Sequence, residues 1–282
     1  MSATVAHLSS RALIAIAGED WRSFLQGLIT QDVDTLAPGE ARFGALLTPQ
    51  GRLLYDLFVV GREDGAWLDV EAEYRAAIIQ RLTMYRLRAK VTIAADDTPV
   101  SILFDPAPGA IPPKPAEGFW AADPRLPELG WRGYGASPPS GATGADEAAR
   151  EAQKLRLGVP GPGDWGSDKT YPIEANFDLL NGIDFKKGCF VGQETTSRMK
   201  RRGVVKSRML PLRFDGVAPA PGAEILAGDL RAGIVTSGGA GGGMALVRLD
   251  RAIGADLMVD GCAVRLERPD WFLAALGEEP AQ

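Results

Sequence analysis

The nine residues from Lys186 to Glu194 read KKGCFVGQE and contain a cysteine in an unusual setting. Two lysines precede Cys189, and nearby cations are expected to favour its thiolate form and so lower its pKa. Gly188 and Gly192 leave the backbone on both sides of the thiol open. Such a cysteine can act as a nucleophile or as a ligand of a soft metal ion. The alternative is a small buried residue in a turn, which is the common position of a free cysteine.

The chain has few other side chains that could share metal chemistry with this thiol. It contains two cysteines and one histidine, which are too few for a disulfide framework. A self-contained zinc or iron–sulfur site needs about four Cys or His ligands, so we expect no metal site formed by this chain alone. Cys262 lies between hydrophobic positions in VDGCAVRLERP and is predicted to be a core strand residue.

Composition narrows the class of protein. The 282 residues are 45% hydrophobic and 24% charged, which is ordinary for a soluble globular protein and predicts one large and one smaller domain. A net charge of −5 argues against a surface that binds nucleic acid throughout. No apolar run reaches the roughly 20 residues of a membrane span, and the N-terminus does not resemble a signal or transit peptide. We therefore expect a bacterial-type cytoplasmic protein with no membrane partner.

The first hundred residues alternate between strand and helix patterns. Apolar residues recur at helical spacing in two segments, residues 19–33 and 73–88. The turn Thr48–Gly51 is predicted to join two strands into a hairpin, residues 42–48 and 52–60. The other predicted strands are residues 12–17, 67–70, 91–94 and 100–104. Hairpins mixed with single helices predict an α+β fold built on antiparallel sheet.

The rest of the chain changes character twice. Nine of the 20 prolines fall between Asp105 and Pro139, so we expect a long surface connection with little regular structure. A helix is predicted over residues 145–157, and short β segments punctuated by glycine follow Lys200, which predicts a small barrel or sandwich. The run Gly238–Gly243 lacks the Lys-Ser/Thr of a phosphate loop and is flanked by strands, so it reads as a hairpin tip.

These segments resemble a known family. The string KGCFVGQE matches the K-G-C-[FY]-x-G-Q-E signature of the YgfZ-type folate-binding proteins at Lys187, Gly188, Cys189, Phe190, Gly192, Gln193 and Glu194. Three further stretches are similar to family segments: residues 10–33, residues 48–56 (TPQGRLLYD) and residues 171–185 (YPIEANFDLLNGIDF). The family is related to the glycine-cleavage T-protein, an aminomethyltransferase, and its mitochondrial members assist iron–sulfur cluster assembly.

The resemblance implies a fold and a ligand. The expected fold is a T-protein-like folate-binding α+β body with ferredoxin-like elements, over residues 1–202 with the Pro-rich connection at about 105–144. A small C-terminal β-barrel follows over residues 203–282. The expected ligand is tetrahydrofolate or a derivative, whose pterin N–H donors suit a carboxylate. The residues implied to contact it are Asp56, Glu174, Asn176 and Arg198. The alternatives are that Asp56 faces solvent and that Glu174 caps a turn.

Two departures bear on catalysis. T-proteins carry two consecutive aspartates where this chain has Tyr55 and Asp56, and a glutamate where it has residues 154–158 (KLRLG). Both departures argue against aminomethyl transfer. If the chain were a one-carbon transferase, Asp56 would be the residue that orients the substrate amine.

A basic arm accompanies the cysteine. Residues 186–208 contain eight Lys or Arg and one acid, Glu194, so this segment carries +7 and the rest of the chain −12. Such a segment concentrates positive potential and suits an anionic partner: a folate polyglutamate tail, an acidic protein or RNA. The alternative is a solvated basic hairpin.

The sequence therefore predicts a folate-binding accessory protein that supports assembly or repair of iron–sulfur enzymes. Cys189 is the predicted functional thiol, and it is expected to ligate a transient cluster shared with a carrier or scaffold protein that supplies the other ligands. The alternatives are a folate-dependent aminomethyl or one-carbon transferase and a protein linked to tRNA modification. We do not expect direct RNA binding, because a chain of net −5 repels a polyanion except along the basic arm.

Overall fold

The computed structural model describes residues 3–105, 111, 114–201, 203, 205–239 and 241–278. The chain divides into two compact units. The first consists of Met1–Gln50, Leu54–Glu151 and Leu180–Gln193, and the second of Gly51–Leu53, Ala152–Leu179 and Glu194–Gln282. The domain boundary between residues 202 and 203 stays a prediction.

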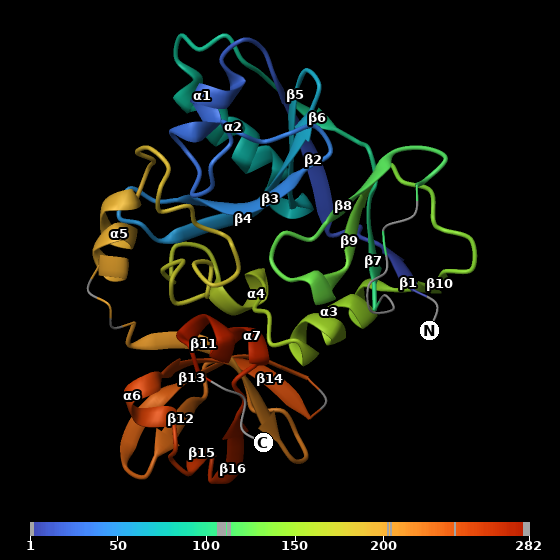
Figure 1. The fold of residues 1–282 in the computed structure, drawn as a ribbon. Helices are drawn as coiled ribbons and strands as arrows, with labels where there is room; N and C mark the ends of the chain where they lie inside the picture. The colour runs from blue at the N-terminus through green and yellow to red at the C-terminus, as the bar shows by residue number, and fades with distance from the viewer. Residues whose placement is uncertain are drawn as a thin grey trace. The chain divides into compact units, whose positions relative to one another are not determined.

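One five-stranded sheet of the first unit is drawn in blue shades in Figure 1. Its strand order is β3-β4-β5-β2-β6, and β2 pairs antiparallel with both β5 and β6. The strands are β2 (Arg11–Ala17), β3 (Ala41–Leu47), β4 (Leu53–Arg62), β5 (Gly65–Glu71) and β6 (Thr92–Asp96). The central strands are buried on both faces, and this explains their nearly continuous apolar runs.

Two α-helices, α1 (Trp21–Gln26) and α2 (Arg75–Arg86), belong to this sheet's core. The short 3₁₀ turn η1 (Ala72–Tyr74) leads into α2. Helix α2 buries Ile78 and Leu82, one turn apart, in the cluster that contains Leu68 and Trp21. Helix α1 is much shorter than the predicted helix over residues 19–33. It ends at Gln26 with Gly27 as its C-cap, and Ile29 then forms an isolated bridge with Leu46, so tertiary pairing overrides the helical pattern.

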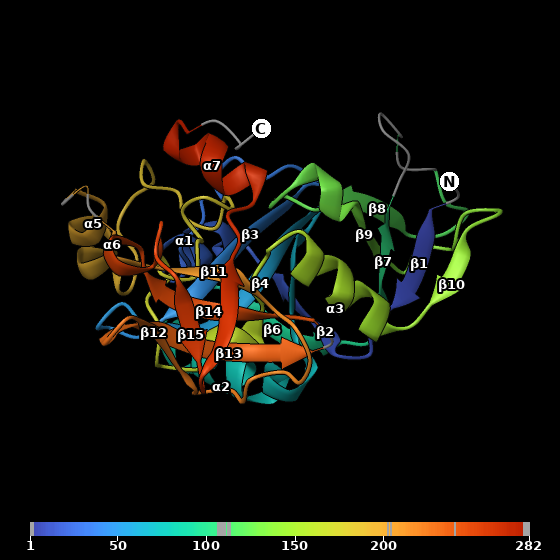
Figure 2. The same cartoon turned by 90° about the horizontal axis from the view of Figure 1, so that it is seen from below.

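The second sheet of this unit has the order β10-β1-β7-β9-β8, and its neighbouring strands lie side by side in Figure 2. It contains β1 (Thr4–His7), β7 (Val100–Phe104), β8 (Phe119–Ala122), β9 (Trp131–Tyr134) and β10 (Thr143–Ala145), with the 3₁₀ turn η2 (Pro127–Leu129) between β8 and β9. Strands β1 and β10 are parallel, whereas the other pairs are antiparallel.

The Pro-rich segment was therefore wrongly predicted to hold little regular structure. Strands β8 and β9 both lie within it, and they pair from Phe119↔Tyr134 to Ala122↔Trp131. Prolines flank these strands and do not interrupt them, so every ladder position keeps its N–H. Residues 106–110, 112 and 113 of the segment lie outside the described residues.

A buried network of charged side chains joins the two sheets of the first unit. Asp69 on β5 accepts hydrogen bonds from Arg11 Nε at 2.7 Å, from Arg132 Nη2 at 2.5 Å and from the Tyr134 hydroxyl at 3.1 Å. The Arg132 guanidinium also lies 3.8 Å from the centre of the Phe58 ring. Burial opposes ionisation of Asp69, but the Arg132 and Arg11 charges outweigh it and hold its pKa below the ordinary value.

A closed six-stranded barrel forms most of the second unit, as the sequence predicted, and appears in orange and red in Figure 1. Its order is β11-β14-β13-β12-β15-β16. The strands are β11 (Ser207–Phe214), β12 (Glu224–Ala227), β13 (Leu230–Gly239), β14 (Gly242–Arg248), β15 (Leu257–Val259) and β16 (Cys262–Leu266). The glycine run is a hairpin tip, because Gly239 pairs with Gly242. A Cβ on Gly243 would lie 2.2 Å from the Ser237 carbonyl oxygen, so the close pairing requires glycine.

The remaining helices are α3 (Glu147–Arg156), α4 (Pro162–Trp165), α5 (Gln193–Arg201), α6 (Leu249–Ala252) and α7 (Asp270–Leu276). Phe272 of α7 is fully buried in the barrel core with Leu210, Leu212 and Val247. No helix in the described part of the chain is long and apolar enough to cross a membrane.

We predict that Asp69→Asn destabilises the first unit strongly. The substitution leaves the Arg11 and Arg132 charges buried without their shared carboxylate, and breaking a buried pair in this way costs about 3–5 kcal/mol. Urea denaturation followed by circular dichroism measures the loss. Asp250→Asn is the matched control, because Asp250 pairs with Arg248 on the surface, and this variant should unfold at the wild-type midpoint. Equal midpoints for the two variants would contradict the assignment.

Candidate functional site

All of the cysteine motif except Glu194 lies in a segment, Leu180–Gln193, that is hydrogen-bonded at several points to residues 27–31. The Thr30 hydroxyl donates to the Gly182 carbonyl at 2.6 Å, and the Asp184 N–H donates to the Thr30 carbonyl at 3.0 Å. Farther along, the Val191 N–H donates to the Gly27 carbonyl at 3.2 Å. Thr30 is completely buried and exchanges hydrogen bonds with Ala45 of β3, so these bonds connect the segment to the first sheet.

Lys187 adds the central attachment of this segment. Its ammonium donates to the carbonyls of Ile29 and Gln31, both at 2.7 Å, and lies 5.3 Å from the centre of the Phe190 ring. Burial lowers the pKa of Lys187 to about 8, against the raising effect of nearby aspartates such as Asp32. Lys187 is therefore a half-buried structural anchor, in addition to being a charge near Cys189.

Cys189 itself is exposed, as is Gly188 before it. A Cβ added to Gly188 would meet nothing within 4 Å, so the approach to the thiol is open at that residue. Phe190 turns inward and is buried, and Val191 packs against the sheet core. Gly192 has φ +82°, a left-handed conformation that favours glycine, and it leads into α5. The motif thus presents one thiol on an anchored loop, and the buried-turn alternative for Cys189 is wrong.

The prediction that Cys262 is a core residue is also wrong. Cys262 is exposed at the start of β16 and pairs with Val259 across the turn Asp260–Gly261, where both residues have positive φ. Along β16 only Val264 and Leu266 are partly buried against the barrel core, whereas Cys262, Ala263 and Arg265 are exposed, so the hydrophobic flanks in the sequence do not bring Cys262 into the core. Exposure alone therefore does not distinguish the two thiols; their surroundings do.

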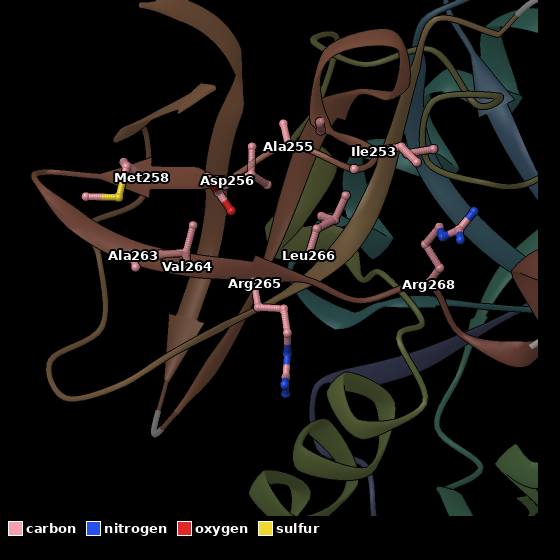
Figure 3. Close-up of a pocket in the computed structure, with 12 residues that line it drawn as sticks. Ile253, Ala255, Asp256, Met258, Ala263, Val264, Arg265, Leu266 and Arg268 are labelled. Atoms are coloured by element: carbon pink, nitrogen blue, oxygen red, sulfur yellow. The ribbon is translucent and has the colours of Figure 1, made fainter. Parts of the chain in front are cut away.

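A groove of about 590 Å³ lies beside this hairpin within the second unit (Figure 3). It is lined by residues 252–258, 263–266 and 268, which include the apolar side chains Ile253, Met258 and Leu266. Arg265 and Arg268 supply positive charge, although Arg268 pairs with Glu278 at 2.5 Å. The site residues predicted from the sequence lie outside this lining.

Asp56, a predicted folate contact, lies on β4 in the first unit and is buried, so the solvent-facing alternative is wrong. Its carboxylate accepts a hydrogen bond from Arg11 Nη1 at 3.2 Å, and Arg11 also holds Asp69. Asp56 is therefore connected to the buried charge network. Sequence reasoning missed that network, although an available signal was a charge inside an apolar strand, as at Leu68-Asp69-Val70.

Glu174 and Asn176, two more predicted contacts, lie in the second unit. Glu174 is half-buried and accepts a hydrogen bond from the Tyr171 N–H at 3.0 Å, which is the turn-capping role left open by the sequence. Burial raises its pKa. Asn176 is fully buried, and its amide donates to the Met209 carbonyl at 2.6 Å and accepts from Arg208 at 3.4 Å. The fourth predicted contact, Arg198, is exposed in the last turn of α5.

The basic arm is less uniform than its charge count suggests. Arg208 is buried in an ion pair with Asp178 at 2.5 Å and donates to the Ile173 carbonyl, so its charge is used within the second unit. Lys187 is anchored as described above. The exposed members within the described residues are Lys186, Arg198, Lys200, Arg201 and Lys206, and Arg202 lies outside those residues. Glu194 and Gln193 open α5, where an acid suits the positive end of the helix.

Comparisons with known proteins place the chain among relatives of one kind. It is 30% identical to the human mitochondrial iron–sulfur cluster assembly factor IBA57 over 300 residues, which cover 94% of this chain and 84% of the human protein. It is 33% and 31% identical to the IBA57 homologues of Neurospora crassa and Mycosarcoma maydis, over 78% of its own length in each case. It spans 56% and 60% of the length of these two fungal relatives.

Two further comparisons concern the fold. Residues 206–273 match the family described as CAF17, C-terminal β-barrel domain. The glycine cleavage system aminomethyltransferase T of Bartonella henselae superposes with a TM-score of 0.76 over 96% of this chain and 86% of its own, at 19% identity. The predicted T-protein-like fold with a C-terminal barrel is therefore confirmed.

The relatives correct one prediction and narrow another. The prediction of a bacterial-type cytoplasmic protein is wrong by this comparison, because the matching relatives are named as mitochondrial proteins. The sequence resemblance is to the YgfZ-type family, whereas the matching relatives are named IBA57, which is a related family. Because it is 30% identical to the human protein over 94% of its own length, this chain belongs to the IBA57 family.

Proposed function

We propose that this chain is an accessory protein of iron–sulfur cluster assembly that binds tetrahydrofolate or a derivative and acts through the thiol of Cys189. The observation that carries the proposal is the exposed Cys189 on a loop that Lys187 anchors to buried backbone. The names of the relatives, iron–sulfur cluster assembly factors, support the cluster-related part. The T-protein-like fold is consistent with a folate-type ligand.

The cluster enters this proposal as cargo. Cys189, as its thiolate, donates a sulfur lone pair to an iron ion of a cluster held by a carrier or scaffold protein, and its proton goes to solvent. The partner supplies the remaining ligands. Within the described residues, no three His, Cys, Asp or Glu side chains are close enough together to hold a metal ion. A single exposed thiol suits transient ligation, since a cluster held by one ligand from this chain is readily passed on.

Glu174 is the residue whose surroundings best fit a pterin. Its desolvated carboxylate accepts one hydrogen bond, from the Tyr171 N–H to Oε2, and a further paired N–H donor would stabilise its ionised form. Bound folate would supply a one-carbon carrier at this place. Asn176 holds the neighbouring backbone through Met209, and we assign it to supporting the Glu174 turn. Arg198, exposed on α5, is suited to the anionic glutamate tail.

The partner is expected to present acidic groups. Among the exposed cations of the basic arm, Lys186 lies three residues before Cys189, and Arg198, Lys200 and Arg201 lie in the last turn of α5, so an acidic carrier surface would be drawn to this stretch of the chain. RNA would also be attracted to these cations through its phosphates, so a link to tRNA modification is the alternative interpretation of the basic arm.

We predict that tetrahydrofolate binds the wild-type chain and that Glu174→Gln weakens binding about ten- to hundredfold. Loss of a charge-assisted hydrogen bond corresponds to about 1.5–3 kcal/mol. Isothermal titration calorimetry measures both affinities, and methylene-tetrahydrofolate turnover measured in parallel tests for one-carbon transfer. Glu224→Gln on the barrel surface, where Glu224 pairs with Arg231, is the matched control and should bind like the wild type. A wild-type chain that releases no heat with folate ends the folate part of the proposal.

We predict that Cys189→Ser folds normally but fails to support cluster-dependent enzymes, whereas Cys262→Ser supports them fully. Both thiols are exposed, so the pair controls for loss of a surface cysteine. The measurement is the activity of a cluster-requiring enzyme in cells whose own copy of this protein is replaced by each variant. Cys189→Ser should leave the activity at the level of cells without the protein. Full activity in Cys189→Ser cells would refute the role of the thiol.

We predict that the unfolding free energy of the wild type, minus that of Lys187→Met, increases as pH rises from 8 toward 10.5. The folded-state pKa of Lys187 is lowered from 10.5 to about 8, so the folded chain binds fewer protons than the unfolded chain in this window. Stability attributable to Lys187 therefore rises with pH there, and the neutral amine still has two N–H groups for Ile29 and Gln31. Urea midpoints of both proteins at pH 7.5 and 9.5 test this, with Lys186→Met as control. A difference that shrinks with pH would contradict the buried-amine assignment.

A further inference from the structure

The C-terminal end of α2 carries a run of six exposed residues, Thr83–Arg88, that no part of the proposed function uses. Three of them have large apolar side chains: Met84 is 65% exposed, Tyr85 38% and Leu87 88%. Arg86 and Arg88 alternate with them. We call Met84, Tyr85, Arg86, Leu87 and Arg88 the α2 patch. A contiguous group of exposed apolar side chains within a polar rim is typical of an interaction surface, whereas single exposed apolar residues are ordinary.

The backbone at Leu87 is a second, independent observation on this patch. Leu87 is the residue after α2, and its φ of +44° and ψ of −107° lie where glycine is favoured and a branched side chain is strained. Helices commonly end in a left-handed glycine or asparagine at this place. A nearly fully exposed leucine here costs backbone energy and gains little burial within this chain, and contact with another molecule would offset that cost.

Charge indicates the nature of that molecule. From Arg75 to Ala95 the chain has five Lys or Arg residues and no acid. Arg75 pairs with Asp97 and Lys90 with Glu19, so two of these charges are balanced. Arg86 and Arg88 have no acidic group within 4 Å among the described residues. The α2 patch therefore combines protruding apolar side chains with two unbalanced guanidinium groups.

We propose that the α2 patch is a docking surface for a partner protein that presents an apolar pocket rimmed by acidic side chains. Leu87 and Met84 enter the pocket, and Arg86 and Arg88 meet the acidic rim. Tyr, Met and Arg are enriched at protein interfaces and Lys is depleted, and the α2 patch has this composition. The partner need not be the protein that meets Cys189, and this docking does not depend on cluster chemistry.

Two other classes of partner fit the α2 patch less well. A nucleic acid would use Arg86 and Arg88 for its phosphates but offers no pocket to an aliphatic tip, so the strained Leu87 would gain nothing. An anionic bilayer would accept both kinds of side chain. However, the chain outside Arg75–Ala95 carries −10, from −5 minus +5, and an extended anionic surface would repel it. A partner protein can contact the α2 patch without approaching the acidic remainder of the chain.

The first arm of the test separates stability from binding. Leu87→Gly relieves the backbone strain, so its melting temperature should equal or exceed that of the wild type, whereas docking should fall at least tenfold. Val217→Gly, which removes a 93% exposed valine from the second unit, is the matched control and should dock like the wild type.

Docking is measured by photocrosslinking in cells that make the protein, with p-benzoyl-phenylalanine in place of Tyr85 in the full chain. The expected result is a covalent adduct with one protein, with its crosslinked peptide beside acidic residues. Leu87→Gly and Arg86→Glu/Arg88→Glu should each reduce the adduct at least tenfold. Lysines at the partner's acidic positions should restore it with the charge-reversed chain. The Cys189→Ser background should leave the adduct unchanged, so failure of the proposed function would not affect this result.

Several results would overturn the proposal. These are the absence of any adduct, an adduct removed by nuclease or extracted with lipid, and a protein adduct that survives Arg86→Glu/Arg88→Glu or Leu87→Gly. A melting temperature of Leu87→Gly well below that of the wild type would show that Leu87 has a structural role.

Discussion

The joint between the two sheets of the first unit depends on one buried carboxylate. Asp69 on β5 receives Arg132 and Tyr134 from β9 of the other sheet and Arg11 from β2 of its own. Apolar contacts are non-directional, whereas a carboxylate bound from three directions adds hydrogen bonds that require one relative position of the donors. Burying these charges opposes folding, and their mutual attraction offsets that cost only in this geometry. The network therefore contributes specificity of sheet packing, and Asp56 belongs to it through Arg11.

Where the sequence predicted correctly, a single local pattern determined the structure. The barrel strands follow from alternation and glycine punctuation, and α2 follows from Ile78 and Leu82. Where it failed, a distant partner decided. Helix α1 stops because Ile29 pairs with Leu46, and β8 exists because β9 lies 12 residues farther along to pair with it. Cys262 looked like core because its neighbours are apolar, but in β16 only Val264 and Leu266 are partly buried against the barrel core, and Cys262 is exposed. The anchoring of Lys187 is likewise invisible in sequence, since its carbonyl partners are more than 150 residues away.

The motif around Cys189 divides its work between buried and exposed side chains. Phe190 and Val191 pack inward, Lys187 binds backbone carbonyls, and only Gly188 and Cys189 at the centre face solvent. An exposed thiol on an unanchored loop would lose entropy on every encounter with a partner. Here the hydrogen bonds to residues 27–31 already restrict the loop backbone, so less of its conformational entropy is lost on binding.

Charge is distributed so that an acidic chain still offers two cationic surfaces. The basic arm carries +7 and the segment Arg75–Ala95 carries +5, so the remaining residues carry −17, from −5 minus 7 minus 5. Some of this positive charge is used internally, as at Arg208 and Lys187. The exposed cations of the α2 patch are arginines that alternate with apolar side chains. The exposed cations of the basic arm are both lysines and arginines, in a stretch of chain that also contains Cys189. Because screening limits such fields to about 10 Å at 0.1 M salt, each surface acts on a partner already close to it. The acidic remainder repels anionic molecules elsewhere, so the same charge distribution that attracts a partner also restricts where it can bind.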